Sequence, residues 1–328
     1  MTRRMPPTGA MTMSPVCEKQ DHNLASQSLS SYLVLAAKGF CMGAANVIPG
    51  VSGGTMALIL GMYEELINAI RSFNLHFLRL VGLLKIREAI SSVSWPFLLP
   101  VGVGVLLATI SLAKVLSWLL ESYPIIVWSF FFGLILSSVL TVSRVIKRWG
   151  MPTFGAAVLG AVGAYFLFGL MPGATPDAPW FIFLSGFLAI CAMILPGVSG
   201  AYVLVLLGKY HYILEAINDK ELGILLILIA GALVGLLSFV RIIGWLLRRY
   251  YDLTMAILIG LMIGSLRKIW PWKETVTTFF DSHGKEVPAL QVNVLPPSLN
   301  SEVGLALLVM FFGFLIVYGM SVVAREKD

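Results

Sequence analysis

Two long apolar segments, roughly 31–70 and 180–217, are each interrupted by the same five residues, Pro-Gly-Val-Ser-Gly. Proline lacks a backbone donor and glycine adopts conformations that other residues avoid, so a continuous helix through either element is not expected. Each arm is too short to cross a bilayer comfortably, and broken backbone is tolerated at membrane depth only inside protein or beside a water-filled cavity. The sequence therefore predicts two re-entrant helical hairpins.

The two interrupted segments are copies of one unit. They align without a gap from Gly39 and Gly186 onward, and farther along Lys114 matches Arg241. Glycine, proline, serine and tryptophan recur in order, whereas chance similarity between apolar segments would match Leu, Val and Ile. Each half contains one hairpin and three spans, and an odd number of spans inserts the halves with opposite orientation. Inverted repeats of broken helices are typical of alternating-access transporters; duplication kept only for packing is the alternative.

Composition indicates a membrane protein. Hydrophobic residues make up 58% of the 328 residues and charged residues only 12%, against roughly 25% charged in a soluble domain. These values exclude a soluble globular enzyme, a disordered protein and a nucleic-acid-binding protein, despite the net charge of +6. We expect an all-α polytopic membrane protein with an inverted repeat, two re-entrant hairpins and about six transmembrane helices. The predicted spans are 97–120, 124–146, 152–171, 223–247, 253–269 and 303–324.

The repeat also predicts the domain organisation. Residues 1–28 are polar and are expected to form a disordered cytosolic tail, followed by a first repeat at 29–172 and a second, inverted repeat at 173–328. Only the first repeat contains the segment 71–96, whose mixture of basic and apolar residues predicts a position along the inner membrane surface. The second repeat contains an external loop at 270–302.

Lysine and arginine lie mainly in the short turns that this arrangement places in the cytosol, such as Lys147 with Arg148. The short turns on the opposite side, near 121–123 and 172–179, contain neither residue. This asymmetry satisfies the positive-inside rule and predicts that both termini are cytosolic. The exceptions lie in or beside the external loop: Arg267, Lys268, Lys273 and Lys285.

The residues after each Pro-Gly pair have the chemistry of an anion site. A helix is expected to begin there, and helix N-termini present unpaired N–H groups and the positive end of the helix dipole. Hydroxyl groups add donors, and glycine lets a ligand approach the backbone. The alternative is a pair of tight turns whose glycines allow close helix packing. The predicted phosphate-binding residues are Ser52, Gly53, Gly54, Thr55, Ser199 and Gly200, with Asn46 on the first entry arm.

Two cations, Lys114 and Arg241, lie within predicted spans. A charge at a helix centre in the bilayer costs about 2.5–3.5 kcal/mol, so it marks a functional site by default. We expect the two to neutralise a phosphate group from opposite membrane ends, with snorkelling to lipid headgroups as the alternative.

Other titratable residues follow the hairpins. Glu64, Glu65 and His211 are candidates for proton coupling, and a solvated helix end is the alternative for them. The three cysteines show no ligand spacing, so we expect neither a disulfide framework nor a metal site, and no cofactor.

The stretch Gly39–Ile70, the paired PGVSGG and PGVSGA elements and the later SLRKIWPW at 265–272 resemble the bacterial polyprenyl-phosphate transporter family of the PopT type. The resemblance covers nearly the whole chain after residue 30. It implies recycling of undecaprenyl phosphate, the lipid carrier of cell-wall precursors, from the outer to the inner leaflet of the bacterial plasma membrane. The implied partners are this lipid and the bilayer, and a homo-oligomer is compatible with them.

Two other functions use a similar architecture. Undecaprenyl-pyrophosphate phosphatases of the BacA type carry a PGxSRSxxT motif, in which this chain has Gly53 for the arginine and Gly54 for the second serine. Splitting a pyrophosphate needs a cation or metal at the developing oxyanion, which this tip does not offer. A proton-coupled small-anion carrier requires a polar translocation path, which the few intramembrane charges disfavour. The sequence therefore predicts a transporter rather than an enzyme.

Overall fold

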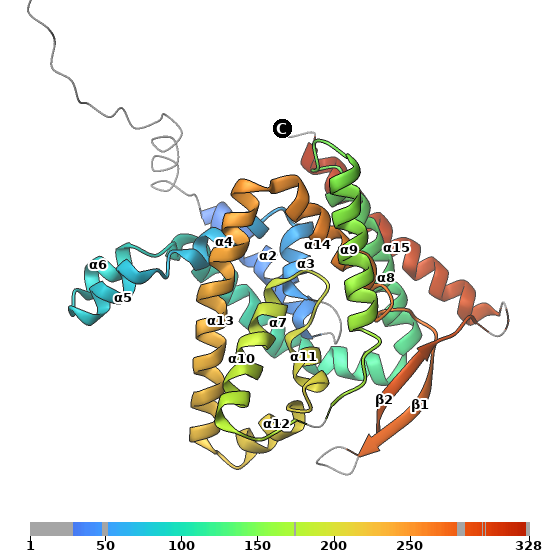
Figure 1. Ribbon diagram of the computed structural model, residues 1–328. Coiled ribbons are helices and arrows are strands. Elements are labelled where there is room, and N and C mark those ends of the chain that lie inside the picture. Colours follow the sequence, from blue (N-terminus) through green and yellow to red (C-terminus); the bar gives the residue numbers. More distant parts are fainter. Residues whose placement is uncertain are drawn as a thin grey trace, which may run out of the picture.

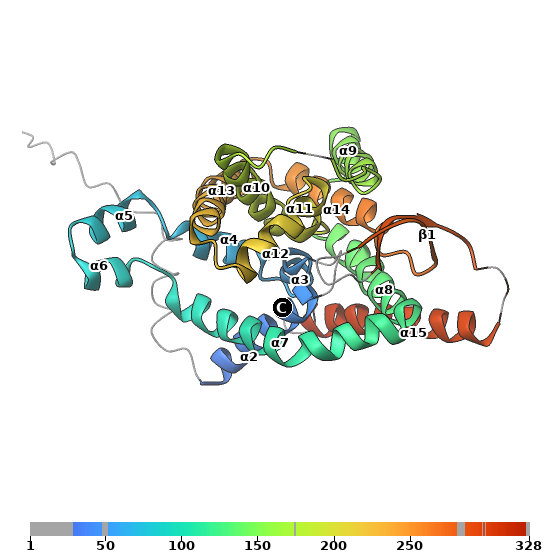
Figure 2. The ribbon, with the colours of Figure 1, turned by 90° about the horizontal axis from the view of Figure 1, so that it is seen from below.

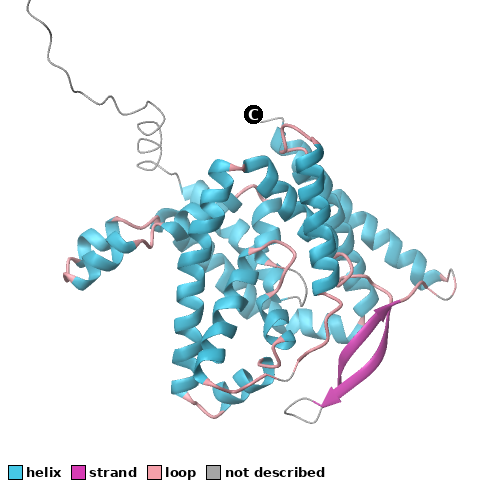
Figure 3. Ribbon diagram, in the orientation of Figure 1, coloured by secondary structure: helices cyan, strands magenta, loops and turns pink. Residues whose placement is uncertain are grey.

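The computed structural model describes residues 29–47, 52–173, 175–280, 286–296, 298 and 300–325. Helices form one bundle with a two-stranded sheet at its edge (Figures 1 and 3). The expected tail at 1–28 and the first Pro-Gly-Val element at 49–51 lie outside the described residues.

The elements of the two halves follow one another in a corresponding order. The first half contains α2 (Leu29–Val47), α3 (Gly53–Ile59), α4 (Tyr63–Arg71), α5 (Leu75–Gly82), α6 (Ile86–Ser91), α7 (Trp95–Ser122), α8 (Pro124–Ser143) and α9 (Met151–Leu167). The second half contains α10 (Pro179–Ile194), α11 (Gly200–Leu206), α12 (Tyr210–Asn218), α13 (Leu222–Arg249), α14 (Tyr251–Ser265), β1 (Lys273–Phe280), β2 (Glu286–Asn293) and α15 (Ser301–Arg325).

Proline marks the starts of several apolar helices. It lies in the first turn of α7, α8, α9 and α10. This position suits proline because the first N–H groups of a helix have no intrahelical partner and the fixed proline φ angle is already helical. The boundaries of these helices are therefore encoded locally in the sequence.

Four helices of the described residues, α7, α8, α13 and α15, are long and apolar enough to cross a membrane. The helices α9 and α14, at the predicted spans 152–171 and 253–269, have only 17 and 15 residues. At about 1.5 Å per residue they measure about 25 Å and about 22 Å, less than a hydrocarbon core of about 30 Å. The helix α14 ends at Ser265, before the end of its predicted span.

The outward faces of the long helices are apolar. Ile110 on α7 is 75% exposed and Leu308 on α15 is 67% exposed, and α9 and α13 expose Leu159 and Leu226 in the same way. Large apolar faces of this extent are not stable in water and indicate contact with lipid. With four candidate spans, the chain is a multi-pass membrane protein.

Corresponding positions in the two halves have the same local structure. Tyr123 ends α7 with φ −137° and ψ 52°, and Tyr250 ends α13 with φ −136° and ψ 55°. The ring of Tyr123 meets Trp118 edge-on at 5.9 Å, and that of Tyr250 meets Trp245 at 5.8 Å. The aligned residues therefore form the same break between two helices twice.

Small residues let matching helix pairs approach closely. A Cβ atom added to Gly39 of α2 would collide with the backbone of Val101 in α7, and one added to Gly186 of α10 would collide with Leu228 in α13. These glycines and their contacts are equivalent in the alignment of the two halves. The pairs α2–α7 and α10–α13 are thus packed in the same manner.

The last helix of each half packs against the other half. Gly133 of α8 lies against Met310 of α15, while Gly260 of α14 lies against Ala157 of α9. The two halves therefore exchange their final helices. Each half depends on the other for the packing of this helix.

The expectation of an all-α chain is wrong in one segment. Residues of the predicted external loop 270–302 form the antiparallel strands β1 and β2, in which Lys273 pairs with Asn293. The run Thr-Val-Thr-Thr in β1 is rich in β-branched residues, which favour extended backbone. Trp270 anchors the base of the hairpin by donating its indole N–H to the Val294 carbonyl at 2.8 Å.

The segment 71–96 contains α5 and α6, which project from the other helices in both ribbon views (Figures 1 and 2). Asn74 caps the N-terminus of α5, and its side-chain oxygen accepts a hydrogen bond from the Phe77 N–H at 3.0 Å. Leu84 and Ile90 expose large apolar side chains on this projection. The position along a membrane surface remains a prediction.

Candidate functional site

The first residues of α3 have acceptors within the protein. Ser52 is the N-cap residue, and its side-chain oxygen accepts a hydrogen bond from the Gly54 N–H at 3.1 Å. The Gly53 N–H donates to the Asn46 side-chain oxygen at 2.7 Å. The backbone donors predicted for a phosphate are therefore engaged in this conformation.

The N-terminus of α3 meets the C-terminus of α10, from the other half of the chain. The Ser52 hydroxyl lies 3.2 Å from both the Met193 and the Leu195 carbonyl oxygens, and the Tyr63 hydroxyl donates to the Ile194 carbonyl at 3.2 Å. The positive end of one helix dipole thus faces the negative end of another. We call this contact between residues 52–63 and 193–197 the hairpin interface.

Glycine is required on the α3 side of the hairpin interface. A Cβ atom on Gly54 would lie 2.7 Å from the Ile194 carbonyl oxygen, and one on Gly53 would lie 2.7 Å from the Asn46 side-chain oxygen. Contacts this short are not tolerated between a real Cβ and a backbone oxygen. Gly54 therefore permits the close approach of the two halves, whereas Gly53 makes room for the Asn46 side chain of its own half.

The second broken segment turns at Gly197, which has a left-handed φ of +86° that favours glycine. The Gly197 N–H donates to the Thr55 hydroxyl oxygen at 2.7 Å, and Thr55 is fully buried. Ser199 occupies the N-cap position of α11 but makes no capping hydrogen bond, unlike Ser52. Gly200 is buried against the Ala189 carbonyl. The two tips are therefore bonded to each other but are not identical.

The predicted intramembrane cations do not join this interface. Lys114 is exposed on α7. Arg241 on α13 donates to the Leu237 carbonyl at 3.0 Å and to the Phe73 carbonyl, just after α4, at 3.4 Å. The structure thus places Arg241 beside the segment that follows the first hairpin.

Arg241 is part of a basic cluster with Arg71 and Arg248. The Arg71 side chain crosses α13 at Gly244, where an added Cβ would meet its Cδ at 2.7 Å. Its Nε is buried and has no hydrogen-bond partner among the described residues. Desolvation, followed by the charges of Arg248 and Arg241, lowers the pKa of Arg71. An anion placed beside these groups would relieve this repulsion.

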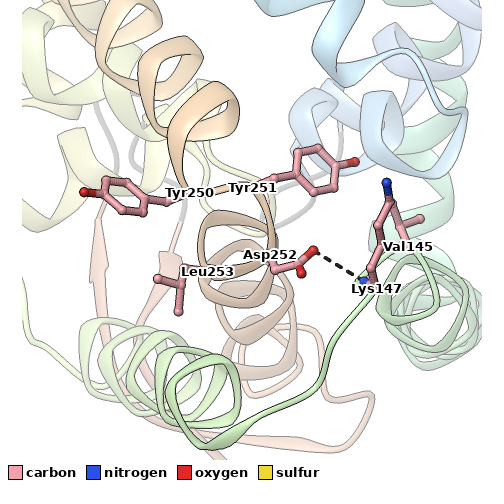
Figure 4. A pocket seen from close by; sticks show the side chains of 6 residues that line it. All are labelled: Val145, Lys147, Tyr250, Tyr251, Asp252 and Leu253. Atoms are coloured by element: carbon pink, nitrogen blue, oxygen red, sulfur yellow. Dashed lines mark hydrogen bonds between the residues drawn. The ribbon is translucent and has the colours of Figure 1, made fainter.

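The proton-coupling candidates lie on different elements. Glu64 on α4 reaches the hydroxyl of Tyr251, which lines a pocket of about 560 Å³, whereas Glu65 is exposed. His211 lies on α12, with its ring edge-on to Tyr210 at 5.6 Å. Figure 4 shows the pocket, in which the Lys147 N–H donates to the Asp252 carboxylate at 3.4 Å. Its lining residues are Val145, Lys147, Tyr250, Tyr251, Asp252 and Leu253.

Sequence reasoning missed an ion pair after α11, in which the ammonium group is buried and the carboxylate is exposed. Lys209 is 2% exposed, forms an ion pair with Asp177 and donates to the Thr175 carbonyl at 2.9 Å. Its counterpart in the first half is Met62, so the repeat gave no signal for it. The sequence analysis singled out Lys268 and Lys273 only as exceptions to the positive-inside rule. That exception was the available indication that these two lysines have another role.

Comparison with known proteins identifies the family. The family model described as undecaprenyl phosphate translocase-like matches residues 42–287. The chain belongs to this family. A polyprenyl-phosphate transporter of Vibrio cholerae is 42% identical over 304 residues, which cover 91% of this chain and 97% of the relative. A polyprenyl-phosphate transporter of Staphylococcus aureus is 32% identical over 256 residues, covering 71% and 84%. No solved structure matches the chain.

Proposed function

We propose that this protein translocates undecaprenyl phosphate from the outer to the inner leaflet of the bacterial plasma membrane, for reuse in cell-wall synthesis. Membership of the translocase-like family and the names of the two relatives support a transporter of this substrate rather than an enzyme. The observation that carries the mechanism is the hairpin interface, where the Ser52 hydroxyl meets carbonyl oxygens of the other half and the Gly197 N–H donates to the Thr55 hydroxyl.

The proposed transporter consists of two inverted repeats, 29–172 and 173–328, and each repeat contains one re-entrant hairpin. The matched breaks at Tyr123 and Tyr250 and the matched glycine contacts support the repeat. Both termini lie in the cytosol, on the side of the Arg71 cluster. Rocking of one repeat against the other exposes the site to each leaflet in turn.

The phosphate group binds where the hairpin interface opens. In the closed state, the Ser52 hydroxyl donates to the carbonyl oxygens of Met193 and Leu195. A phosphate oxygen takes their place on Ser52, and the Gly53 and Gly54 N–H groups turn to the phosphate from their present acceptors, because an anion is favoured at a helix N-terminus. The isoprenoid tail stays in the lipid throughout the cycle.

Other residues complete the site in the open states. Asn46 and Thr55 release their backbone partners Gly53 and Gly197 and turn toward the headgroup. In the second tip, Ser199 and Gly200 offer a hydroxyl and a close backbone approach. Ser199 supports this role because it makes no capping bond in the closed state.

Charged residues accompany the headgroup and its driving ion. Arg241, with Arg71 and Arg248 beside it, neutralises the phosphate on the cytosolic side, and Lys114 acts nearer the opposite end. Glu64, Glu65 and His211 carry a coupled proton. Glu64 contacts Tyr251, which lines the pocket, and this contact supports access of Glu64 to solvent.

A leaflet-resolved assay with purified protein in vesicles tests this function. Undecaprenyl phosphate added to the outer leaflet becomes protected from external phosphatase at a rate above that of protein-free vesicles. The variant carrying Arg241→Gln and Lys114→Gln loses this transport while it remains folded. Release of inorganic phosphate from undecaprenyl pyrophosphate by the wild type would instead establish the phosphatase alternative.

A further inference from the structure

Two lysines at the base of the β1–β2 hairpin lie against aromatic rings in the bundle. The Lys268 ammonium lies 5.0 Å from the centre of the Tyr202 ring on α11, and the Lys273 ammonium lies 4.2 Å from the centre of the Trp128 ring on α8. Lys273 also donates to the Lys268 carbonyl oxygen. The two side chains are partly buried and share one small region.

Among the residues that the structure describes, these lysines have no carboxylate partner. Within the described ranges, neither forms an ion pair with a carboxylate, and Glu274, next to Lys273 in β1, is exposed. Arg267 differs, because its guanidinium donates to the Tyr165 carbonyl at 2.8 Å and packs on the Tyr165 ring. Removing an ammonium group from water without a counter-charge is unfavourable, so an anion at this place would stabilise both charged groups.

This environment changes the pKa of Lys273. Desolvation, followed by the positive charge of Lys268, lowers the pKa of Lys273 to about 7. An arriving anion would restore the charged form, since an opposite charge at this distance favours it.

The lysine pair adjoins the tip of the second hairpin. Tyr202, which contacts Lys268, follows Ser199 and Gly200 in α11. At Gly197, an added Cβ would lie 3.0 Å from the Ser265 hydroxyl, one turn before Lys268. Lys273 is the first residue of β1. The hydrogen bond from Trp270 to the Val294 carbonyl fixes the base of the β1–β2 hairpin and with it the position of Lys273.

The first half has no equivalent of this pair. In the alignment that matches Ser138 with Ser265, Lys268 and Lys273 correspond to Thr141 and Ile146. The feature therefore belongs to one end of the bundle only, the end opposite the Arg71 cluster in the proposed topology. A packing requirement of the repeat would have appeared in both halves.

We propose that Lys268 and Lys273 form the entry site for the phosphate group, which captures the polyprenyl phosphate headgroup from the outer leaflet before it reaches the hairpin interface. This inference rests on the proposed function. Tyr202 and Trp128 hold the two ammonium groups in place, and the headgroup then moves past Tyr202 to Ser199. The absence of a matching pair in the first half makes capture efficient from one side of the membrane.

The test uses the full chain and three measurements on the Lys268→Gln, Lys273→Gln double variant. Lys220→Gln is the matched control, because Lys220 is an exposed lysine in the turn between α12 and α13. The measurements are transport in vesicles, binding of labelled polyprenyl phosphate in detergent, and the Tm with and without this lipid or inorganic phosphate. Arginine variants at both positions test rescue by charge.

We expect the double variant to show at least a tenfold higher half-saturating lipid concentration and a matching loss of binding, with rescue by arginine. Polyprenyl phosphate raises the Tm of the wild type but not that of the double variant, and without ligand the double variant is at least as stable, since unpaired charges are removed. Stabilisation by inorganic phosphate that the double variant loses also supports the site.

Unchanged half-saturation and binding in the double variant would overturn the entry site while leaving transport intact. If the wild type binds the lipid through these lysines but does not transport it, the entry site stands and the proposed function fails. If the double variant does not fold, the arginine variants and the ligand-dependent Tm of the wild type test whether the two lysines bind the phosphate group. A Tm of the wild type that neither phosphate ligand raises would then overturn the proposal.

Discussion

The substitution Gly54→Ala tests the hairpin interface with a single methyl group. The added Cβ would lie 2.7 Å from the Ile194 carbonyl oxygen, whereas ordinary contacts begin at 3.4 Å. The two helices must therefore separate by about 0.7 Å, and overpacking of this kind costs about 1–3 kcal/mol. A cost of this size lowers the population of the closed state by about 5- to 150-fold.

The assay is the initial rate of undecaprenyl phosphate transport in vesicles. In the proposed cycle the protein passes through the closed interface, so we expect the Gly54→Ala variant to transport at least fivefold more slowly than the wild type. Gly102→Ala on α7 is the control, since an added Cβ there meets no atom within 4 Å, and it should transport normally. A wild-type rate for Gly54→Ala would refute the reasoning, because the interface would then not close against this glycine during transport.

Three further predictions concern single side chains. Ser52→Ala removes the N-cap of α3, which costs about 1 kcal/mol, so it should lower the Tm and the transport rate, whereas Ser52→Thr should retain both; equal behaviour of the two variants would contradict this. Lys273 has a pKa lowered to about 7, so its charge is present below that pH and lost above it. Lipid binding should therefore weaken as the pH rises from 6 to 8, and Lys273→Arg should flatten the profile beyond the contribution of the phosphate itself. Asp177→Asn leaves the buried Lys209 ammonium without its carboxylate, so it should lower the Tm more than Lys209→Met does, because an apolar replacement of a buried charge is often tolerated; the reverse order in thermal unfolding would argue against this.

The repeat made much of the fold predictable. Aligned glycines such as Gly39 and Gly186 lie at equivalent helix contacts, and the aligned Tyr123 and Tyr250 end helices with nearly equal angles. These features depend on local sequence and on side-chain size, which an alignment of the two halves displays directly.

Other features depend on contacts that the sequence does not specify. The partners of Ser52 are backbone carbonyl groups of Met193 and Leu195, and a carbonyl has the same chemistry in every residue. The exchange of α9 and α15 between halves follows from three-dimensional packing, because either partner helix offers the same glycine surface. Repeat reasoning therefore identified the residues of the tips but not the atoms that they contact.

Departures from the repeat are where the prediction of the site was weakest. Lys209 aligns with Met62, and the lysines at 268 and 273 align with uncharged residues. An alignment of the two halves emphasises what they share, so it does not display residues present in one half only, such as Lys268 and Lys273. The violation of the positive-inside rule near 267–273 was the available signal for them.

Photocrosslinking of the substrate headgroup tests most directly whether phosphate binds at the hairpin interface. A polyprenyl phosphate analogue with a photoreactive group beside the phosphate is irradiated during transport, and the labelled peptides are identified by mass spectrometry. We predict labelling within 46–55 and 193–200 that excess undecaprenyl phosphate suppresses. Labelling confined to peptides outside these two ranges would contradict the account.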